Sequence, residues 1–576
     1  MQLRRVGPLL AAAAALASGH GFARGREARA SETPGAGAAA PRAAVFALPA
    51  ERRTSWKPGI PGGIPVRDRV CATVDAATHG DGAQDATQAI RAAIDACPVG
   101  QVVALSAGTF AVTGPLVINK GIVLRGAGPK QTHLTSSGFN GAVVWLGPLW
   151  PHVLASVKLT ADGAKGATSV RVANAKGFVP GSLALIDELW DPGYVQWSAK
   201  RSPPGSPSRA WFSRPDRPVG QMVEIESVSG DAVRFTTPLH IAFDTAHDAQ
   251  LSTWDVPATH NAGLEDLHVY GGGNHNIVLG LAAYSWVKNV ESEWSTGESI
   301  GLNASFRCVV RDSFFHHSPQ LYPGGGAYGL SFSFASADNL IENNIFWHFN
   351  KVMVMRASGG GNVVGYNYFE DGFIGRTPED YTRWMEVGMS ASHMACPHYE
   401  LFEGNQAFNV DADNTWGNSV YVTFFRNHAS GKRRSFPDVD NRRAIGLMAG
   451  SWWYTFVGNV LGYPGMKPDP HAGFRYEAAP PWGPPVPMWQ LGYDPEDWKR
   501  PADAKVLSTT LREGNFDYVT NEVHWSKGAL ALPDSLYLAA KPPFFGDERW
   551  PWVDPVGATK LYRLPARVRF DAMNNP

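Results

Sequence analysis

The chain has 576 residues, which is too long for one ordinary globular domain, so we expect two or three domains or one long repeat array. Its hydrophobic share of 44% argues against widespread disorder. The 51 basic and 52 acidic residues give a net charge of −1. A near-neutral chain has no overall basic field, so binding to nucleic acid is not expected.

The first 18 residues have the pattern of an export signal. Arg4 and Arg5 precede a run of Leu and Ala, and Ala-Leu-Ala at 15–17 fits a cleavage site, although a plain unstructured N-terminus is the alternative. The signal is too short to span a bilayer, and no other run of about 20 apolar residues follows, so no integral membrane segment is expected in the mature chain. We therefore expect a secreted or periplasmic protein. Residues 19–64 are predicted to form a flexible leader.

Four cysteines are present: Cys71, Cys97, Cys308 and Cys396. Export permits disulfides, and Cys71 and Cys97 flank one expected helix, so they are the candidate pair. The sequence has no CxxC pair, which argues against a cysteine zinc site. Cys308 and Cys396 are expected to be buried apolar fillers.

A repeat runs through the middle of the chain. Several segments share an apolar run, then Asn or Asp, then often an aromatic residue, as in GLEDLHVY, NLIENNIF and NVVGYNYF. Successive polar positions are 23, 23, 32, 23, 38, 22 and 32 residues apart, so the basic unit is 22–23 residues with occasional insertions. These positions are Asp266, Asn289, Asp312, Asn344, Asn367, Asn405, Asn427 and Asn459.

A unit of this length is too short for helical repeats and fits a coil of three short strands. Apolar residues three positions before the polar residue (Trp286, Val309, Ile341) and two positions after it (Phe314, Phe346) form columns that can stack inward. Asn and Asp suit a bend because they tolerate left-handed backbone. The alternative is an antiparallel β-sandwich, which the regular period disfavours. The predicted fold class is all-β: a right-handed parallel β-helix solenoid.

Segments that depart from the period predict the remaining organisation. Residues 65–150 are expected to hold a capping helix that starts at Asp85, followed by the first coils. Residues 151–250 are expected to form a small inserted β-module. The main β-helix is expected over 251–465, and the Pro- and Trp-rich residues 466–576 are expected to wrap the C-terminal end or one flank.

The region 74–128 contains GDG at 80–82, a helix at 85–94, AGTF at 107–110 and LRGAG at 124–128. It resembles the N-terminal region of the pectate-lyase superfamily of β-helix proteins, which includes polygalacturonase-like and rhamnogalacturonase-like domains. The resemblance implies an extracellular or periplasmic protein that acts on polysaccharide. It carries over no catalytic residue, because the Asn-Thr-Asp pattern of the hydrolases is missing and the arginines of RTPEDYTR at 376–383 only loosely resemble the signature of the lyases.

The candidate catalytic residues are therefore chosen by their position within the coil. On a β-helix, residues of adjacent coils on the same strand are neighbours, so side chains at matching positions can meet within about 10 Å. Matching positions before the bend are held by Arg356, His393, Asp411 and Asp413. Insertions at 371–395 and 431–443 are expected to flank them and to contribute Asp371, Arg376, Glu386 and Arg433.

Two mechanisms fit these residues. In β-elimination from a uronate, His393 or an Arg removes the proton next to the carboxylate, and Arg356 or a bound Ca²⁺ offsets the developing charge. Asp411 and Asp413 would then be the oxygen ligands of Ca²⁺, unless no cofactor is required. In inverting hydrolysis, Asp411 or Asp413 would act with Asp371 or Glu386 as a carboxylate pair about 6.5–9.5 Å apart.

Other side chains are candidates for binding the substrate: Lys288, Arg311, Arg376, Arg426, Trp384 and Trp416. Solvated or packed side chains are the ordinary alternative for the candidate residues. His316, His317 and His348 suggest a metal, but they stand among aromatic residues, so packing is the favoured interpretation.

The sequence thus favours an exported, monomeric enzyme that binds and cleaves an acidic polysaccharide, with a slight preference for a lyase. The first alternative is an inverting glycoside hydrolase. The second is a non-catalytic glycan-binding or cell-surface structural β-helix.

Overall fold

The structure is a computed structural model. It describes residues 44–197, 203, 205, 206, 209, 214, 216–319, 326–373, 388–434, 443–466, 488–494, 501–554, 559–561 and 563–573. The predicted signal at 1–18 lies outside the described residues. No helix among them is both long enough and apolar enough to cross a membrane.

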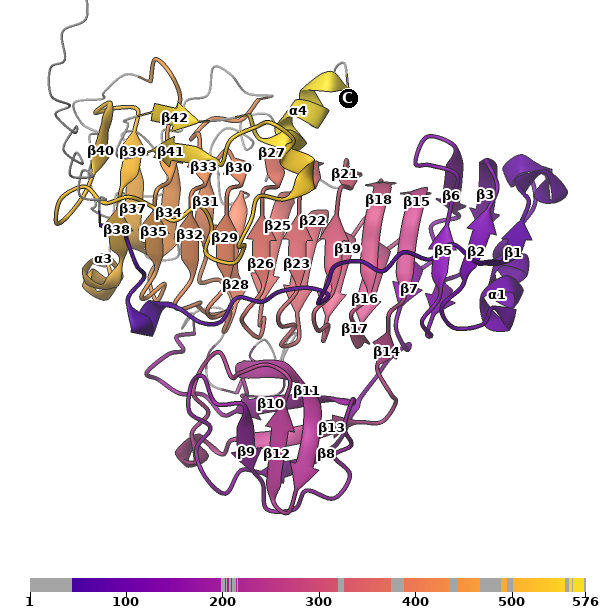
Figure 1. Ribbon diagram of the computed structural model, residues 1–576, viewed down its shortest axis with the longest axis horizontal. Coiled ribbons are helices and arrows are strands. Elements are labelled where there is room, and N and C mark those ends of the chain that lie inside the picture. Colours follow the sequence, from indigo (N-terminus) through magenta and orange to yellow (C-terminus); the bar gives the residue numbers. More distant parts are fainter. Residues whose placement is uncertain are drawn as a thin grey trace, which may run out of the picture. The chain divides into compact units, whose positions relative to one another are not determined.

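Ten parallel strands stack in register to form one long sheet, here called the ten-stranded sheet (Figure 1). Its strands are β4 (Leu116–Ile118), β7 (Ala142–Leu146), β16 (His275–Gly280), β19 (Glu298–Asn303), β22 (Tyr328–Ser333), β25 (Lys351–Arg356), β28 (Met389–Met394), β31 (Val410–Ala412), β34 (Ile445–Met448) and β37 (Trp489–Tyr493). Each strand pairs with the strand one coil away, as a solenoid requires.

The larger, 22-stranded sheet consists of two rows of strands on either side of a bend. The first row contains β1 (Val70–Val74), β2 (Val102–Leu105), β5 (Val123–Arg125), β15 (Gly263–Tyr270), β18 (Trp286–Glu293), β20 (Val309–Arg311), β23 (Leu340–Glu342), β26 (Val363–Gly365), β29 (Leu401–Glu403), β32 (Thr423–Phe425), β35 (Thr455–Val457) and β38 (Leu511–Glu513). The second row contains β3 (Gly108–Val112), β6 (Thr132–Ser136), the ends of β15 and β18, β21 (Phe314–His316), β24 (Ile345–Phe349), β27 (Tyr368–Gly372), β30 (Gln406–Ala407), β33 (His428–Ala429), β36 (Val460–Leu461), β39 (Asn515–Asp517) and the antiparallel β40 (Glu522–His524). Each coil thus has three strands, and the predicted parallel β-helix is confirmed.

Aromatic and aliphatic side chains stack inward from coil to coil. Phe346 lies between Phe315 and Phe369, with ring centroids 4.8 and 5.2 Å away. The predicted column with Phe314 was therefore one residue out of register in that coil. Val309 was also wrongly placed in the core column, because Val310 pairs with Ile341. A one-residue shift moves a side chain to the opposite face of a strand.

A ladder of buried asparagines lines the bend between the two rows. The Oδ1 atom of Asn405 accepts hydrogen bonds from the backbone N and the Nδ2 of Asn367, at 2.9 and 3.1 Å. Asn405 in turn donates from its backbone N and Nδ2 to Asn427 Oδ1, at 3.0 and 2.9 Å. The same pattern joins Asn344, Asn367, Asn405, Asn427, Asn459 and Asn515.

The first three polar positions of the predicted repeat do not lie in this ladder but in a neighbouring column. Asp266, Asn289 and Asp312 have positive φ values of 56°, 52° and 57°, and Asn343, not Asn344, is their counterpart at 56°. Ser313 precedes Asn344 in the buried ladder and donates its backbone N–H to Asn344 Oδ1 at 3.0 Å. Asp312 and Asn344 therefore lie in different columns, and the spacing of 32 residues between them is not a true repeat length.

A second polar ladder runs along the turn before the first row and ends on a buried carboxyl group. Asn339 donates from its backbone N and Nδ2 to Asn362 Oδ1, at 3.0 and 2.8 Å. Asn362 donates to both carboxyl oxygens of Glu400, each at 3.1 Å. Burial raises the pKa of Glu400 to about 8, although hydrogen bonds from Ser358 and Asn362 oppose the rise.

This raised pKa predicts that Glu400 makes stability depend on pH. Its stabilising contribution is complete below the unfolded pKa near 4.5 and is lost as pH rises through about 8, because over this range the carboxyl group ionises in the unfolded chain while burial keeps it protonated in the folded protein. We expect the melting temperature of Glu400→Gln, relative to the unmodified protein, to increase steadily between pH 5 and pH 8. Glu522→Gln, at an exposed position in β40, is the control and should show no such trend. A pH-independent difference for Glu400→Gln would contradict the prediction.

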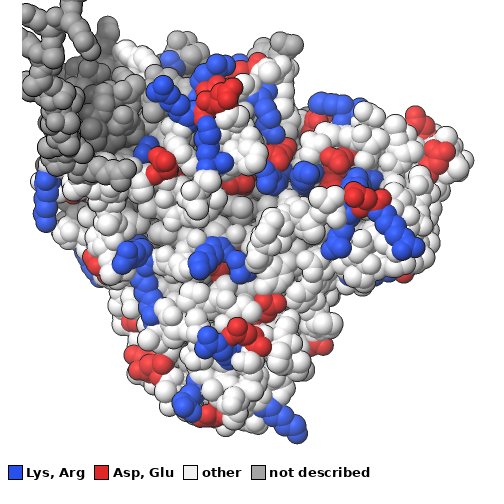
Figure 2. Space-filling view, in the orientation of Figure 1, with Lys and Arg blue, Asp and Glu red and all other residues white. Residues whose placement is uncertain are grey.

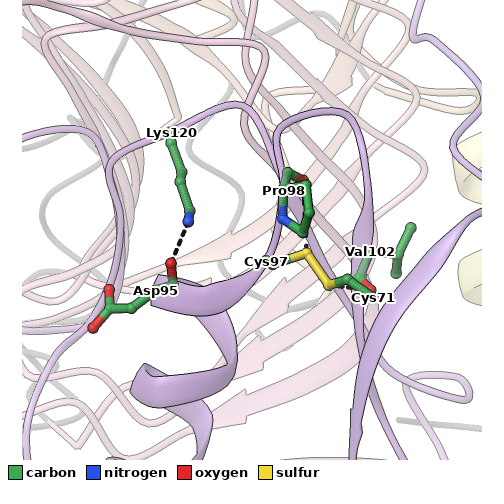
Figure 3. The surroundings of a disulfide bond; sticks show 6 residues. All are labelled: Cys71, Asp95, Cys97, Pro98, Val102 and Lys120. Carbon is green, nitrogen blue, oxygen red and sulfur yellow. Dashed lines mark hydrogen bonds between the residues drawn. A yellow bond between two sulfur atoms is a disulfide. The ribbon is translucent and has the colours of Figure 1, made fainter.

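A helix and a disulfide close the N-terminal end of the solenoid. Helix α1 (Thr87–Ala96) buries Ile90 and Ile94, and Asp85 accepts the Thr87 backbone N–H at 2.9 Å. Cys71 of β1 and Cys97, at the end of α1, form a disulfide with their Cα atoms 5.6 Å apart (Figure 3). The bond joins the capping helix to the first strand. Cys308 and Cys396 are free and buried.

A six-stranded antiparallel sheet is inserted between β7 and β15. In spatial order it contains β8 (Val153–Lys158), β13 (Gln250–Trp254), β10 (Leu183–Glu188), β11 (Val219–Ser229), β12 (Ala232–Phe235) and β9 (Ser169–Arg171). Leu185 and Met222 of this module pack in one apolar cluster with Phe306 and Ala335 of the solenoid. The short strands β14 (Thr259–His260) and β17 (Ala282–Ala283) pair at the turns beside it.

Residues 44–69 form an extended segment along the first row, here called the N-terminal strap (Figure 1). Phe46 and Trp56 pack against apolar side chains that point outward from β26, β29, β32 and β35. Ile60 and Ile64 pack on Trp286 and Val309 in the same way. Residues 44–64 were predicted to be flexible, but their few apolar side chains fit the outward apolar face of the first row.

The solenoid continues past the predicted end at 465, through β37, helix α3 (Ala504–Thr509), β38 and β39. The tail then packs on the solenoid: Tyr366 of the turn before β27 lies in one apolar cluster with Phe545, Trp552 and Phe570. The tail ends with the hairpin of β41 (Trp552–Asp554) and β42 (Thr559–Leu561) and with helix α4 (Pro565–Ala572).

On the face shown in Figure 2, Lys and Arg side chains lie beside Asp and Glu side chains, in keeping with the near-zero net charge.

Candidate functional site

The outward face of the ten-stranded sheet carries a row of buried polar side chains. Successive residues of a strand point to opposite faces, so Leu330, Met353 and Met389 fill the core while the intervening positions point outward. The outward column runs through paired residues from coil to coil: Trp145, Val278, Gly301, Ser331, Val354, Ser390, Asp411, Gly446 and Gln490.

Asp413, just after β31, is the centre of the most compact cluster on this face. Its carboxylate lies 2.8 and 3.0 Å from the Nδ1 of His393, and its Oδ2 lies 3.0 Å from the Nζ of Lys351. These residues come from β28 and β25, one and two strands away. The Asp413 side chain is 1% exposed, whereas 10% of the His393 side chain reaches solvent. The ring of Tyr328 stands edge-on to His393, with centroids 6.2 Å apart.

The charges of this cluster are set by burial and by mutual contact. Burial alone would raise the pKa of Asp413, but His393 and Lys351 outweigh it and hold that pKa well below its ordinary value. Burial lowers the pKa of His393, and the opposing effect of Asp413 does not restore it. At neutral pH the cluster therefore contains a carboxylate and a neutral imidazole, which can accept a proton.

Arg356 belongs to a second pair on the same face. Its guanidinium donates to the carboxylate of Glu298 and to the hydroxyl of Ser331. His275 Nδ1 lies 3.5 Å from the other oxygen of Glu298. Burial alone would raise the pKa of Glu298, but Arg356 and His275 reverse the effect and lower it. Arg356 also lowers the pKa of His393, so the two pairs are electrostatically linked.

Asp411 forms a third pair, with Arg443 of the next coil. The guanidinium of Arg443 lies 3.4 Å from Asp411 Oδ1 and 2.7 Å from Gln490 Oε1. The pair fits because residue 446 is glycine: a Cβ atom there would stand 2.7 Å from Asp411 Oδ1 and 3.1 Å from Arg443 Nε. Burial raises the pKa of Asp411 to about 7, although Arg443 and Lys351 oppose the rise.

The structure brings together Arg356, His393, Asp411 and Asp413 on one face, as the coil positions predicted. Asp371 was wrongly placed with them, because it lies within β27 in the second row and accepts a hydrogen bond from Trp347 Nε1 at 2.9 Å. Glu386 lies outside the described residues.

The predicted substrate-binding residues do not gather at this site. Lys288 and Arg311 pair in the first row, on another face of the solenoid. Arg426 is buried and donates to the carbonyl groups of Pro533 and Pro551 at 3.0 and 3.1 Å, so it holds the C-terminal tail. Trp416 pairs with Met394, the residue after His393, through an isolated backbone β-bridge. Arg376 and Trp384 lie outside the described residues.

Calcium coordination by Asp411 and Asp413 is disfavoured by their partners. Asp411 already faces the cation of Arg443, and Asp413 faces that of Lys351.

Two other clusters of the described residues have the side chains that can hold a metal ion, with donor atoms within 4.8 Å of one another. They are Glu293, His316 and His317; and Glu188, Asp191 and His247.

Lys351, Glu298 and Arg443 were missed by the sequence analysis. Lys351 and Arg356 enclose the apolar run of the strand KVMVMR, and two cations on one buried strand need acidic partners. That pattern could have identified Lys351 in addition to Arg356. Glu298 and Arg443 carry no such local signal.

An aromatic cavity of about 160 Å³ lies further along the same sheet. It is lined by Trp145 and Trp150, with ring centroids 5.9 Å apart, and by Trp254 and Phe334. Trp145 occupies the outward column three strands from Ser331. Trp150 is 71% exposed, so its ring is available for stacking against a ligand.

Residues 72–147, which form the cap and the first coils, match the family model "Rhamnogalacturonase A/epimerase, pectate lyase-like". Over these residues the chain is similar to the pectate lyase-like family, as the sequence resemblance predicted. No curated protein matches this chain in sequence.

Several solved structures resemble this chain at low sequence identity. The tailspike gp61 of Pseudomonas phage phi297 is 14% identical, with a TM-score of 0.45 over 65% of this chain and 57% of the tailspike. The A-module of a mannuronan C-5 epimerase from Azotobacter vinelandii is 14% identical, with a TM-score of 0.36 over 77% of this chain and 86% of the module. A tailspike of Acinetobacter baumannii bacteriophage AP22, solved with a capsular saccharide, is 11% identical, with a TM-score of 0.29 over 68% of this chain and 77% of the tailspike. The chain thus spans less than two thirds of the phi297 tailspike.

Proposed function

We propose that this protein is an exported enzyme that cleaves an acidic polysaccharide by β-elimination at the outward face of the ten-stranded sheet. The observation that carries the proposal is the buried cluster of His393, Asp413 and Lys351. The Cys71–Cys97 disulfide supports export, because such bonds persist in oxidising compartments.

In the proposed reaction, a neutral His393 removes the proton on the sugar carbon next to the carboxylate. The electron pair of that C–H bond forms a carbon–carbon double bond, and the bond to the glycosidic oxygen on the adjacent carbon breaks. Asp413 accepts from Nδ1 of His393, which leaves Nε2 as the proton acceptor. Lys351 and Arg356 supply positive charge for the negative charge that develops on the uronate. The exposed Trp150 offers a stacking surface for the glycan further along the sheet.

This proposal is tested by digesting uronate-containing polysaccharides with purified protein and following absorbance at about 235 nm, which reports the new double bond. Rising absorbance together with new reducing ends supports elimination. Reducing ends without absorbance would instead support inverting hydrolysis, for which Asp411, with its pKa of about 7, is the proton donor. An altered sugar configuration without new chain ends would indicate epimerisation. Saturable binding without any product would indicate a non-catalytic module.

The protonation state of His393, the proposed base, sets the expected pH dependence of the reaction. His393 acts only when it is deprotonated, and burial lowers its pKa, so kcat/KM should rise with pH through a pKa below the ordinary histidine value of about 6.5. Asp413 raises the pKa of His393, so Asp413→Asn should shift this rise to lower pH and reduce the plateau. Steady-state rates between pH 4 and pH 9 measure both effects. A rise centred above pH 7 in the unmodified protein would contradict the assignment of His393.

A further inference from the structure

A cluster of histidine and glutamate side chains lies on the second row, apart from the ten-stranded sheet. Glu293 ends β18, His316 ends β21, and the two residues pair directly across adjacent coils. His317 follows with a φ of 50°. Adjacent residues of a strand normally point to opposite faces, and this left-handed backbone breaks that alternation. The two imidazole Nδ1 atoms consequently lie 2.8 Å apart.

One donor atom from each of these three residues lies within 4.8 Å of the others. Oε2 of Glu293 is 3.6 Å from the Nδ1 of His316. A tetrahedral ion bound at 2.0–2.1 Å holds its ligand atoms about 3.3–3.4 Å apart. The carboxylate and His316 therefore already have nearly the required separation, and the two imidazoles need to part by only about 0.5 Å.

The surrounding residues orient these donors. Nε2 of His316 lies 3.2 Å from Oε1 of Glu291, whose other oxygen is 2.8 Å from Lys130 Nζ. If Nε2 of a neutral imidazole donates to this carboxylate, Nδ1 keeps its lone pair for a ligand. The other oxygen of Glu293 lies 3.3 Å from His268 Nε2, which turns Oε2 toward the histidines.

Aromatic rings fix the two imidazoles. Phe314 stacks on His316 with centroids 4.1 Å apart, and Trp347 stands edge-on to His317 at 4.7 Å. The ring of His348 lies 4.7 Å from that of His317, and the buried Nδ1 of His348 has no hydrogen-bond partner in the described part of the chain. Packing alone, as the sequence analysis favoured, does not require two imidazole nitrogens and a carboxylate to converge.

We propose that Glu293, His316 and His317 bind a divalent transition-metal ion of the zinc class, with the fourth position open. Two imidazoles and one carboxylate are ligands for Zn²⁺ rather than for Ca²⁺, which prefers six to eight oxygens. Three protein ligands leave one tetrahedral position for water or for an oxygen of a bound glycan. The ion would also hold the ends of β18 and β21 together.

The test uses the purified, tag-free full-length chain, stripped with chelator and titrated with Zn²⁺ against a chromogenic chelator. We expect one tightly bound zinc per chain. His316→Ala/His317→Ala should weaken binding more than about 100-fold, and Glu291→Gln, which removes the carboxylate behind His316, by about 10–100-fold. Co²⁺ in place of zinc should give the visible absorption bands of a tetrahedral ion.

The matched control is His247→Ala, which disrupts the other histidine and carboxylate cluster, in the inserted module. It should leave zinc affinity unchanged. The proposal is overturned if the unmodified chain binds no zinc, or if His316→Ala/His317→Ala binds it as tightly as the unmodified chain. If only His247→Ala lost zinc binding, the zinc site would be in the inserted module and the proposal would be overturned. Glu293→Gln replaces a ligand with a side chain of the same shape, so it keeps the test decisive if the double variant fails to fold.

Discussion

Replacement of His393 by alanine is expected to lower kcat/KM for uronate cleavage by about 10²–10⁴-fold, the usual contribution of a general base. The imidazole combines a lowered pKa with access to solvent, whereas the Asp413 side chain is only 1% exposed. Removing it leaves the Lys351–Asp413 ion pair in place, so the fold should be retained. The measurement is the initial rate of double-bond formation, with circular dichroism as the check on folding.

His428→Ala is the matched control for this variant. His428 is also a neutral histidine, since partial burial lowers its pKa to about 4, but it lies in the second row and bonds to the carbonyl of Gly462. We expect its kcat/KM to stay within about twofold of the unmodified protein. Unchanged cleavage in His393→Ala, or an equal loss in both variants, would refute the proposed base.

The largest effect on stability is expected from Asn405→Leu in the middle of the asparagine ladder. The substitution removes the Oδ1 atom that accepts from the backbone N–H and the Nδ2 of Asn367, and it removes the Nδ2 that donates to the carbonyl of Val364, all in a buried bend. The Nδ2 of Asn367 keeps its second acceptor, the carbonyl of Ile341. Each unsatisfied buried group costs about 1–3 kcal/mol, so we expect the free energy of unfolding to fall by about 3–5 kcal/mol. Chemical denaturation followed by tryptophan fluorescence measures this change.

Asn289→Gly is the control for the ladder. Asn289 lies in the outer column, and its Nδ2 donates a hydrogen bond to Asp266 Oδ1 at 2.7 Å. Glycine accepts its φ of 52°, so we expect a loss below about 1 kcal/mol. If Asn405→Leu were no more destabilising than Asn289→Gly, the ladder would not be a major source of stability.

The fold could be predicted because the repeat combines two independent signals, an apolar column and a polar bend. The exact register could not. Asp312-Ser313 and Asn343-Asn344 each place two polar residues at the bend, and the sequence alone does not say which one turns inward. The flexible-leader prediction failed for a related reason: the apolar residues that hold the N-terminal strap, such as Trp286 and Val309, had been assigned to the core.

The site was predictable to the extent that it follows the coil. His393 and Asp413 lie on adjacent strands of one sheet, and counting back from the bend placed them together. Lys351 reaches the carboxylate of Asp413 from a strand two coils away. Counting residues back from the bend gives neither the length nor the direction of a side chain, so it could not predict this contact. Asp371 was misplaced because β27 continues through it, so it belongs to the second row and not to the groove wall.

The N-terminal strap gives the solenoid a property that its coils alone would not have. A stack of repeats contacts only its neighbours and can fray one unit at a time from either end. Here the backbone N–H of Phe46 bonds to Ala531 near the last coils, Gly59 bonds to Asp338 in the middle, and Arg67 accepts from Arg125 near the first. Peeling off a terminal coil therefore also disturbs a chain segment shared with all the others. The solenoid should consequently melt as one cooperative unit, and the strap can dock only after the final coils have been synthesised.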